Sequence, residues 1–282
     1  MSPPFPPPDP GVTGPRTLAA RVVPPGALRL GRGRLLIERN LLVARRTWYV
    51  PLSGLAEPVF YLLSIGIGIG RLVGRIPGPH HTTYAYATYV APALLASSAM
   101  NGAVYESTFN VYFKLKFARI YDAVLATPME PSDVARGEIA NAVLRGTVYA
   151  AAFVAMMVGL GDAPSAWTVL ALPAAVLISA AFASVGVAAT TWMRGWSDFE
   201  LIQLVLLPLF LFSTTFYPLA TYPRWLQLVV ELTPLFHAVA LTRALTLGTV
   251  TPAVVGHAAY LAIMAVAGVA VAGRRIAVLL RR

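Results

Sequence analysis

Three ionisable side chains interrupt segments that are otherwise almost free of charge. Glu57 is the one charged residue in 50–70, Arg145 is the one in 139–161, and Glu106 directly follows a charge-free run. A charge inside a lipid bilayer is costly, so each of these residues is a candidate for a functional or a pairing role. We expect Glu106 and Arg145 to pair if their helices are adjacent. Glu57 is either functional or solvated near the membrane surface.

The remaining groups that could do chemistry are scattered. The chain has no cysteine, which excludes thiolate catalysis, disulfides and cysteine-based metal sites. His80 and His81 are adjacent in a loop, too few ligands to predict a metal site. The G-x-G-x-G run at 66–70 lies in an apolar segment without a preceding strand, and no G-x-x-x-x-G-K-[ST] loop is present. We therefore expect no catalytic residue, metal or cofactor in this chain.

Composition indicates an integral membrane protein. Hydrophobic residues make up 57% of the 282 residues and charged residues only 12%. Soluble domains carry roughly 25% charged residues, so a soluble enzyme is excluded. The net charge is +10. Its placement follows membrane topology, as shown below, and nucleic-acid binding is not expected.

Apolar segments long enough to cross a bilayer need roughly 20 residues. The sequence predicts an all-α protein with six such helices, and Glu138 is placed to favour the N-terminus of the third. The six spans are expected at about 50–71, 87–109, 138–160, 166–192, 200–219 and 252–273.

Lysine and arginine set the expected orientation. One side of the predicted membrane layout holds 17 of them, including the first 50 residues and the C-terminus, while the other side holds 4. Basic residues favour the cytoplasmic side, so both termini are expected there. The protein itself is expected in the inner (cytoplasmic) membrane of the cell. The same basic surface suits contact with anionic lipid.

The first 50 residues divide into two parts. Residues 1–30 are rich in proline and arginine and are expected to be a disordered tail, which leaves 31–282 as one transmembrane domain. Residues 33–50 combine leucine and arginine in a pattern typical of an amphipathic helix lying at the membrane surface. Two interpretations of that helix stay open: a simple anchor, or an element that transmits movement into the first span.

A cytoplasmic loop at 111–137 is too charged to span and too long for a tight turn. Apolar residues from Phe117 to Leu125 recur at helical spacing, and Thr127-Pro128 ends the helix. Ser132 or Asp133 can cap the helix that follows. The short helix is either an inert interfacial element or one that docks in a groove of a soluble partner.

An outer segment at 220–251 contains two apolar runs split at Thr233-Pro234. The runs cover 225–232 and 235–247, and both are too short to span. Tyr222 and Trp225 suit the headgroup region. We expect a helical hairpin that dips back into the outer leaflet between spans 5 and 6.

These segments together resemble the permease subunits of ABC-2 type exporters, in the nodulation-protein J and daunorubicin-resistance branch. The resemblance covers about residues 30–282. It is carried by YLLSIGIGIG at 61–70, YVAPALLASSAMNGAVYESTF at 89–109, FARIYDAVLATPMEPSDVARGEI at 117–139, and FLFSTTFYPLATYPRWLQLVVELTPLFHAVALTRALTLG at 210–248. Asp122 stands where this branch is expected to have glutamate, so the charge is kept.

The resemblance implies that two permease copies work with two copies of a separate ATPase, which binds ATP and Mg²⁺. The loop helix would be the coupling helix that sits in a cleft of the ATPase. Its expected contact residues are Arg119, Ile120, Tyr121, Asp122, Val124, Leu125, Thr127 and Pro128. The second permease copy is expected to be this same chain.

The family exports amphiphiles such as lipo-oligosaccharides, glycolipids and hydrophobic drugs, and nothing in the sequence chooses among them. Aromatic residues along spans 2 and 5 either stack on such a cargo or simply pack. They are Tyr89, Tyr105, Phe109, Phe212, Phe216 and Tyr217. A stand-alone secondary transporter and a membrane-embedded lipid-sugar transferase are the alternatives. Neither has support from inverted repeats or from clustered acids.

Overall fold

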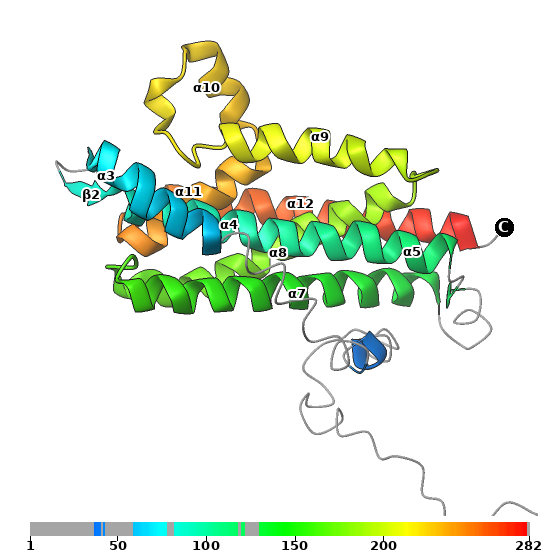
Figure 1. Cartoon of the computed structure of the whole chain (residues 1–282). Helices are drawn as coiled ribbons and strands as arrows, with labels where there is room; N and C mark the ends of the chain where they lie inside the picture. Colours follow the sequence, from blue (N-terminus) through cyan, green and yellow to red (C-terminus); the bar gives the residue numbers. More distant parts are fainter. Residues whose placement is uncertain are drawn as a thin grey trace, which may run out of the picture.

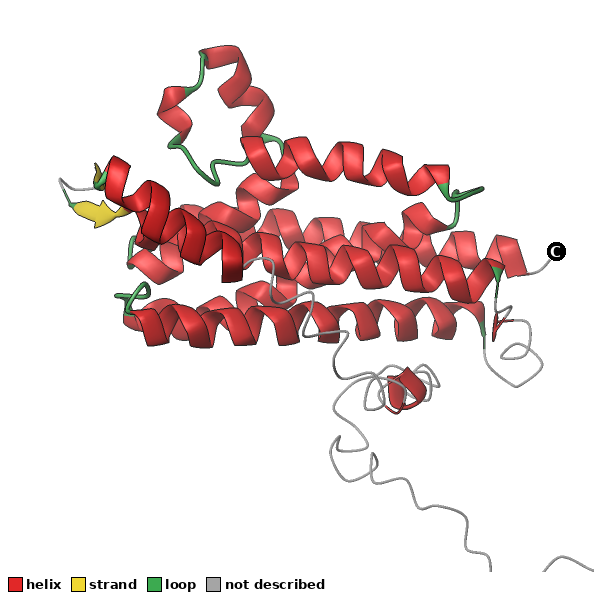
Figure 2. Cartoon of the chain, in the orientation of Figure 1, coloured by secondary structure: helices red, strands yellow, loops and turns green. Residues whose placement is uncertain are grey.

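The computed structural model describes residues 37–40, 42, 59–77, 82–117, 120–121 and 130–280. Within these residues the chain is an elongated bundle of helices, with one small pair of strands (Figures 1 and 2). The predicted tail, Glu57 and most of the predicted coupling helix lie outside the described residues. Of the predicted interfacial helix, residues 37–40 and 42 are described and are helical.

Long helices form the body of the bundle. One continuous helical run joins α4 (Tyr86–Tyr105), a π-helical segment η5 (Glu106–Asn110) and α5 (Val111–Lys116). The others are α7 (Pro131–Leu160), α8 (Ala171–Thr190) preceded by the 3-10 helix η6 (Ala166–Leu170), α9 (Ser197–Phe212) and α12 (Ala253–Leu280). Residues 59–64 are helical and lead into the π-helical segment η3 (Ile65–Ile69) and α3 (Gly70–Val73).

Among the described residues, three helices are long and apolar enough to cross a membrane by themselves: Pro131–Leu160, Ala166–Thr190 and Ala253–Leu279. A bent pair, α10 (Arg224–Glu231) and α11 (Pro234–Leu247), passes the same test only when taken together. The chain is therefore a helical protein with several membrane-crossing candidates, and the count of six spans stays a prediction.

Small residues bring the central helices together. α8 packs against α7 and α12, and α4 packs against α7, α8 and α11. A side chain at Gly146 of α7 would collide with the Ser179 hydroxyl and the Ala99 carbonyl, and one at Gly268 of α12 would collide with Ser184. Close approach through glycine, alanine and serine is the usual way for helices to associate in lipid. The backbones of the central helices therefore approach one another closely.

α9 differs from the other long helices because none of its residues is buried. Its leucines and valines, such as Leu201, Leu204 and Leu207, are exposed. In Figure 1 it runs along one side of the bundle above α4 and α5, while α12 lies behind them. Its half-buried residues Ile202, Leu206, Leu209 and Phe210 pack against the core.

The predicted break in the outer segment is present. The side chain of Thr233 accepts a hydrogen bond from the backbone N–H of Phe236, and Pro234 occupies the first turn of α11. Proline needs no donor there and Thr233 satisfies an otherwise free one, so a new helix begins at this point. α10 and α11 are bent by 84° at the break. We call this end of the bundle the hairpin end, and the opposite end, where α12 finishes, the C-terminal end (Figure 1).

Several boundaries differ from the sequence predictions. The all-α prediction missed a two-stranded antiparallel pair, β1 (Arg75–Pro77) with β2 (Thr83–Ala85). α7 begins at Pro131, seven residues before the predicted span, because Glu130 and Asp133 form a reciprocal capping box. Glu138 is therefore the eighth residue of α7, in its third turn, so its predicted role at the helix N-terminus was wrong.

Candidate functional site

An ion pair joins α7 to the π-helical segment η5. Arg145 Nη1 donates to Glu106 Oε2, and the same carboxylate accepts hydrogen bonds from Asn110 Nδ2 at 2.6 Å and Asn141 Nδ2 at 2.7 Å. Arg145 also donates to the Tyr149 hydroxyl at 3.2 Å. The predicted pairing is present, and every oxygen of the buried carboxylate has a donor. The pair thus holds α4, η5 and α7 in one register.

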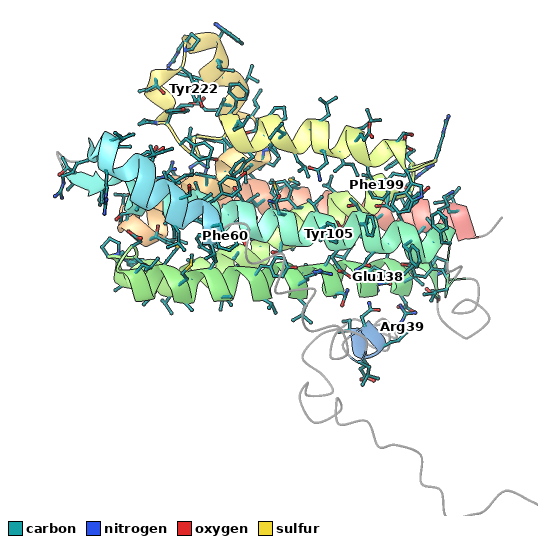
Figure 3. The ribbon with its side chains drawn as sticks, viewed as in Figure 1. Arg39, Phe60, Tyr105, Glu138, Phe199 and Tyr222 are labelled. Atoms are coloured by element: carbon teal, nitrogen blue, oxygen red, sulfur yellow. The ribbon has the colours of Figure 1, made fainter. Side chains whose placement is uncertain are left out.

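A second buried carboxylate lies nearer the C-terminal end. Glu138 on α7 has a fully buried side chain, and its Oε2 accepts from Lys114 Nζ of α5 at 2.7 Å. Arg39 Nη2, on the N-terminal helical segment, lies 4.0 Å from Glu138 Oε1. Asn40 Oδ1 accepts from Arg39 at 3.0 Å and faces Lys114 Nζ at 3.5 Å. Figure 3 shows Arg39 and Glu138 facing each other across the two segments.

We call Arg39, Asn40, Lys114, Tyr121 and Glu138 the Glu138 cluster. It links the predicted interfacial helix, the α5 end of the predicted coupling loop and α7. A buried carboxylate is stable only when cations and donors surround it, so release of one partner is costly. The cluster therefore ties the N-terminal helical segment and α5 to α7.

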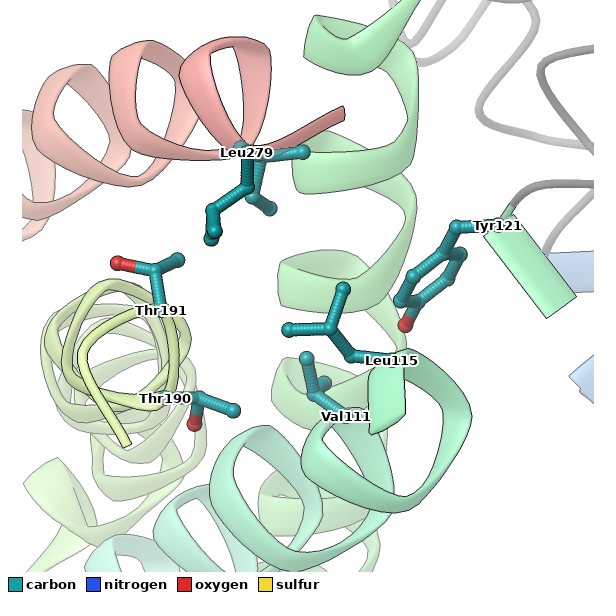
Figure 4. Close-up of a pocket in the computed structure, with 7 residues that line it drawn as sticks. Val111, Leu115, Tyr121, Thr190, Thr191 and Leu279 are labelled. Atoms are coloured by element: carbon teal, nitrogen blue, oxygen red, sulfur yellow. The ribbon is translucent and has the colours of Figure 1, made fainter. Parts of the chain in front are cut away.

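Tyr121 fastens the predicted coupling loop to the bundle. Its ring is buried and lines a small pocket with Val111, Leu115, Thr190 and Leu279, as Figure 4 shows. Burial, and then the neighbouring Glu138 carboxylate, raise the pKa of the Tyr121 phenol well above its ordinary value. Tyr121 therefore faces the body, and of the other predicted coupling residues only Ile120 is described.

Aromatic residues gather where α9 begins. Trp196 lies beside Phe109, Tyr112, Phe117 and Phe199, with ring centroids 5.5–6.1 Å apart. Tyr105 stacks on Phe109 at 5.3 Å, and Phe113 stacks on Phe117 at 5.6 Å. We call these seven residues the Trp196 cluster. It attaches the start of α9 to the helix that leads into the coupling loop, and two of its members, Tyr105 and Phe109, were predicted as cargo-pathway residues.

The other predicted pathway aromatics lie at the hairpin end. Tyr89 lies beneath the Arg243 guanidinium, whose Cζ is 4.0 Å from the ring centroid. Phe216 contacts Tyr217, at 6.4 Å between centroids, and its carbonyl accepts from the Tyr86 hydroxyl at 3.4 Å. Phe212 contacts Tyr222 at 6.2 Å. We call Tyr86, Tyr89, Phe212, Phe216, Tyr217, Tyr222 and Arg243 the Arg243 cluster.

The structure thus divides the predicted pathway residues between two ends of the bundle. Sequence reasoning missed Lys114, Glu138, Trp196 and Arg243 as members of these clusters. Arg243 was counted only as a loop charge, although a lone cation within an apolar helical run was a usable signal. The contacts of Lys114 with Glu138 join residues 24 positions apart, and no local pattern shows them.

Residues 33–247 match the sequence profile of the ABC-2 type transporter family. The chain belongs to the ABC-2 type transporter family. It is also 30% identical over 213 residues to Nodulation protein J of Rhizobium leguminosarum bv. trifolii, covering 75% of this chain and 79% of that protein. It is 32% identical over 235 residues to Nodulation protein J of Sinorhizobium fredii, covering 81% and 86%.

Membership of the ABC-2 type transporter family places the three clusters within a membrane transport protein. An ABC-2 transporter chain is a membrane component of a transport system, which agrees with the apolar helices of this one. The matched region contains the Glu138, Trp196 and Arg243 clusters, the Glu106–Arg145 pair and the predicted coupling loop. The resemblance recognised from the sequence is therefore confirmed at the level of the family.

Proposed function

We propose that this chain is the permease subunit of an ATP-driven exporter in the inner membrane, with six spans and both termini in the cytoplasm. The family match across 33–247 is the observation that carries the proposal. The hairpin formed by α10 and α11 would lie in the outer leaflet, and residues 31–282 would form a single transmembrane domain.

Energy would come from two copies of a separate ATPase that binds ATP and Mg²⁺. The loop at 117–129 would dock on it, with Asp122 and Arg119 setting the register. The Glu138 and Trp196 clusters support this role because they connect the two sides of that loop to the body and to α9. Binding of ATP would then bias the permease between two arrangements, through differences in contact energy.

A second copy of this chain would complete the pathway. The exposed apolar side chains of α9 support this arrangement, because α9 lies along the body without burying any residue of its own. The aromatics of the Trp196 and Arg243 clusters would line the route of an amphiphilic cargo such as a lipo-oligosaccharide, a glycolipid or a hydrophobic drug. Aromatic faces suit both sugar rings and planar drugs.

Affinity purification from native membranes in mild detergent, followed by mass spectrometry, tests the proposal. We expect a soluble ATPase at near-equal amount to this chain. A chain that purifies alone in repeated preparations would contradict the proposal.

A further inference from the structure

The guanidinium of Arg243 lies among neutral groups at the hairpin end. Its Nε donates to the Tyr89 carbonyl at 3.3 Å, Nη1 donates to Thr214 Oγ1 at 3.4 Å, and Nη2 donates to the Thr214 carbonyl at 2.8 Å. Among the residues that the structure describes, no carboxylate forms an ion pair with it. Its positive charge is therefore solvated by dipoles and by the Tyr89 ring without being neutralised.

The contrast with Arg145 makes this arrangement informative. Arg145 is the other arginine on a described helix interior that contacts a tyrosine ring from α4, and it has Glu106 as its counter-ion. An ionisable residue within the apolar part of a membrane protein normally has an identifiable partner. Arg243 makes three hydrogen bonds and one ring contact, yet no counter-ion for it is present in the described part of the chain.

Thr214, which accepts two hydrogen bonds from Arg243, has an unusual backbone conformation. Thr214 has a φ of 58°, which is unusual for a β-branched residue. This conformation lets the carbonyl and the hydroxyl of Thr214 both accept from the same guanidinium. Strain of this kind persists only where surrounding contacts determine it, and it concentrates at binding sites.

Two N–H groups of the guanidinium remain after these contacts. Arginine has five donors, and one on Nε and one on each Nη are used. The residue as a whole is half-buried, so part of its surface remains exposed. A planar pair of donors matches the oxygens of a phosphate, sulfate or carboxylate group.

The surroundings favour an amphiphile as the carrier of that anion. Tyr222 lies near Tyr217 and near Tyr89, the ring beneath Arg243: burial, and then Tyr217 and Tyr89, raise the pKa of Tyr222 above its ordinary value. Tyr217 is exposed, as are Leu228 of α10 and Leu232, which directly follows that helix. A ligand at Arg243 would thus have its charge on the guanidinium, a polar ring beside tyrosines and an apolar chain along the hairpin.

We propose that Arg243 binds the anionic group of an amphiphile, which is either the exported cargo or a lipid of the surrounding bilayer. If the amphiphile is the cargo, this proposal rests on the proposed exporter function; if it is a bilayer lipid, it does not. It deepens that function by requiring a negative charge on the transported molecule.

The test measures ligand affinity on the purified full-length chain, together with any subunit that purifies with it, in phosphatidylcholine nanodiscs. The two probes are dodecyl phosphate and dodecylphosphocholine, which share a chain and a phosphate but differ in net charge. Thermal stabilisation against probe concentration gives the affinity. A charge-assisted contact predicts a preference of about tenfold to a hundredfold for dodecyl phosphate.

Three variants separate binding from a purely structural role. Arg243→Gln should abolish the preference. Arg224→Gln, which removes an exposed arginine from α10 at the same end, should keep it. Thr214→Gly relieves the strained φ and removes one acceptor but keeps the cation, so its preference should remain above tenfold.

The outcomes are distinct. A preference that survives in Arg243→Gln, or one that is absent from the native chain, overturns the proposal. If Arg243→Gln fails to assemble, Arg243→Lys decides, because it keeps the charge and loses the planar fork: a reduced preference supports the proposal and an unchanged one contradicts it.

Nanodiscs with phosphatidylglycerol identify the source of the anion. Loss of dodecyl phosphate binding there indicates a bilayer lipid, and retained binding indicates a cargo site. None of these measurements requires the ATPase, so a failure here is distinguishable from a failure of the proposed exporter function.

Discussion

Arg145 on α7 and Glu106 at the start of the π-helical segment η5 form a buried ion pair. The side chain of Glu106 is 5% exposed and that of Arg145 is 16% exposed. π-Helical segments inside α-helices are rare and often occur at functional sites. Here the segment coincides with the residue that pairs across to α7. The pair therefore fixes how α4 and α5 sit against α7.

Breaking this pair from one side should be costly. Glu106→Gln leaves the Arg145 charge buried without a counter-ion, and we expect a loss of about 3–5 kcal/mol in stability. Thermal unfolding in detergent would measure the loss. The double variant Glu106→Gln with Arg145→Met removes the orphaned charge and should recover part of it. A double variant as unstable as the sum of the single changes would contradict the pairing as the source of stability.

The Glu138 cluster predicts that the N-terminal helical segment is held by charge. Glu138→Gln weakens its attraction for both Lys114 and Arg39, so the segment should separate from α7. Spin labels on cysteines introduced at Leu42 and Leu144, both exposed, would report this as a broader distance distribution. Glu231→Gln, at an exposed position at the end of α10, serves as the control and should leave the distribution unchanged. An unchanged distribution in Glu138→Gln would show that other contacts hold the segment.

Trp196 should secure the start of α9. Trp196→Ala removes contacts with four aromatic rings, and we expect faster hydrogen exchange across the first turns of α9. The residue is 51% exposed, so the loss of stability should be near half of the roughly 3–5 kcal/mol typical of a buried tryptophan. Trp225→Ala, at a position 67% exposed and outside the clusters, should change neither quantity. Equal effects of the two changes would argue against an anchoring role for Trp196.

The proposed orientation can be tested with a single new cysteine, because the chain has none. His80→Cys introduces it between β1 and β2 in the sequence, in a segment that the proposed topology places outside. It should react with a membrane-impermeant thiol reagent added to intact cells. Labelling only in inverted vesicles would show that this position is cytoplasmic and would contradict the proposed topology.

Features that depend on neighbouring residues were predicted better from the sequence than features that depend on contacts between distant segments. The break at Thr233-Pro234 was predicted because a capping hydroxyl and a proline act on their own neighbours. The cap of α7 was predicted at Ser132 or Asp133 but is Glu130, an acid that is uncommon as a cap, and Asp133 is its partner in the capping box. Burial of Glu138 depends on Lys114 and Arg39, which come from other segments. The grouping of the pathway aromatics into two clusters depends on where α9 lies, and residue spacing carries no such information.

The central claim is that a separate ATPase drives this chain through the loop at 117–129. The most direct measurement is the amount of ATPase that purifies with the chain when Asp122 is changed to lysine. Asp9→Lys, the same charge change in the N-terminal tail, is the matched control. The account predicts near-equal ATPase for the native chain and for Asp9→Lys, and a several-fold loss for Asp122→Lys at unchanged membrane levels. Equal recovery of ATPase with all three chains would contradict the coupling assignment.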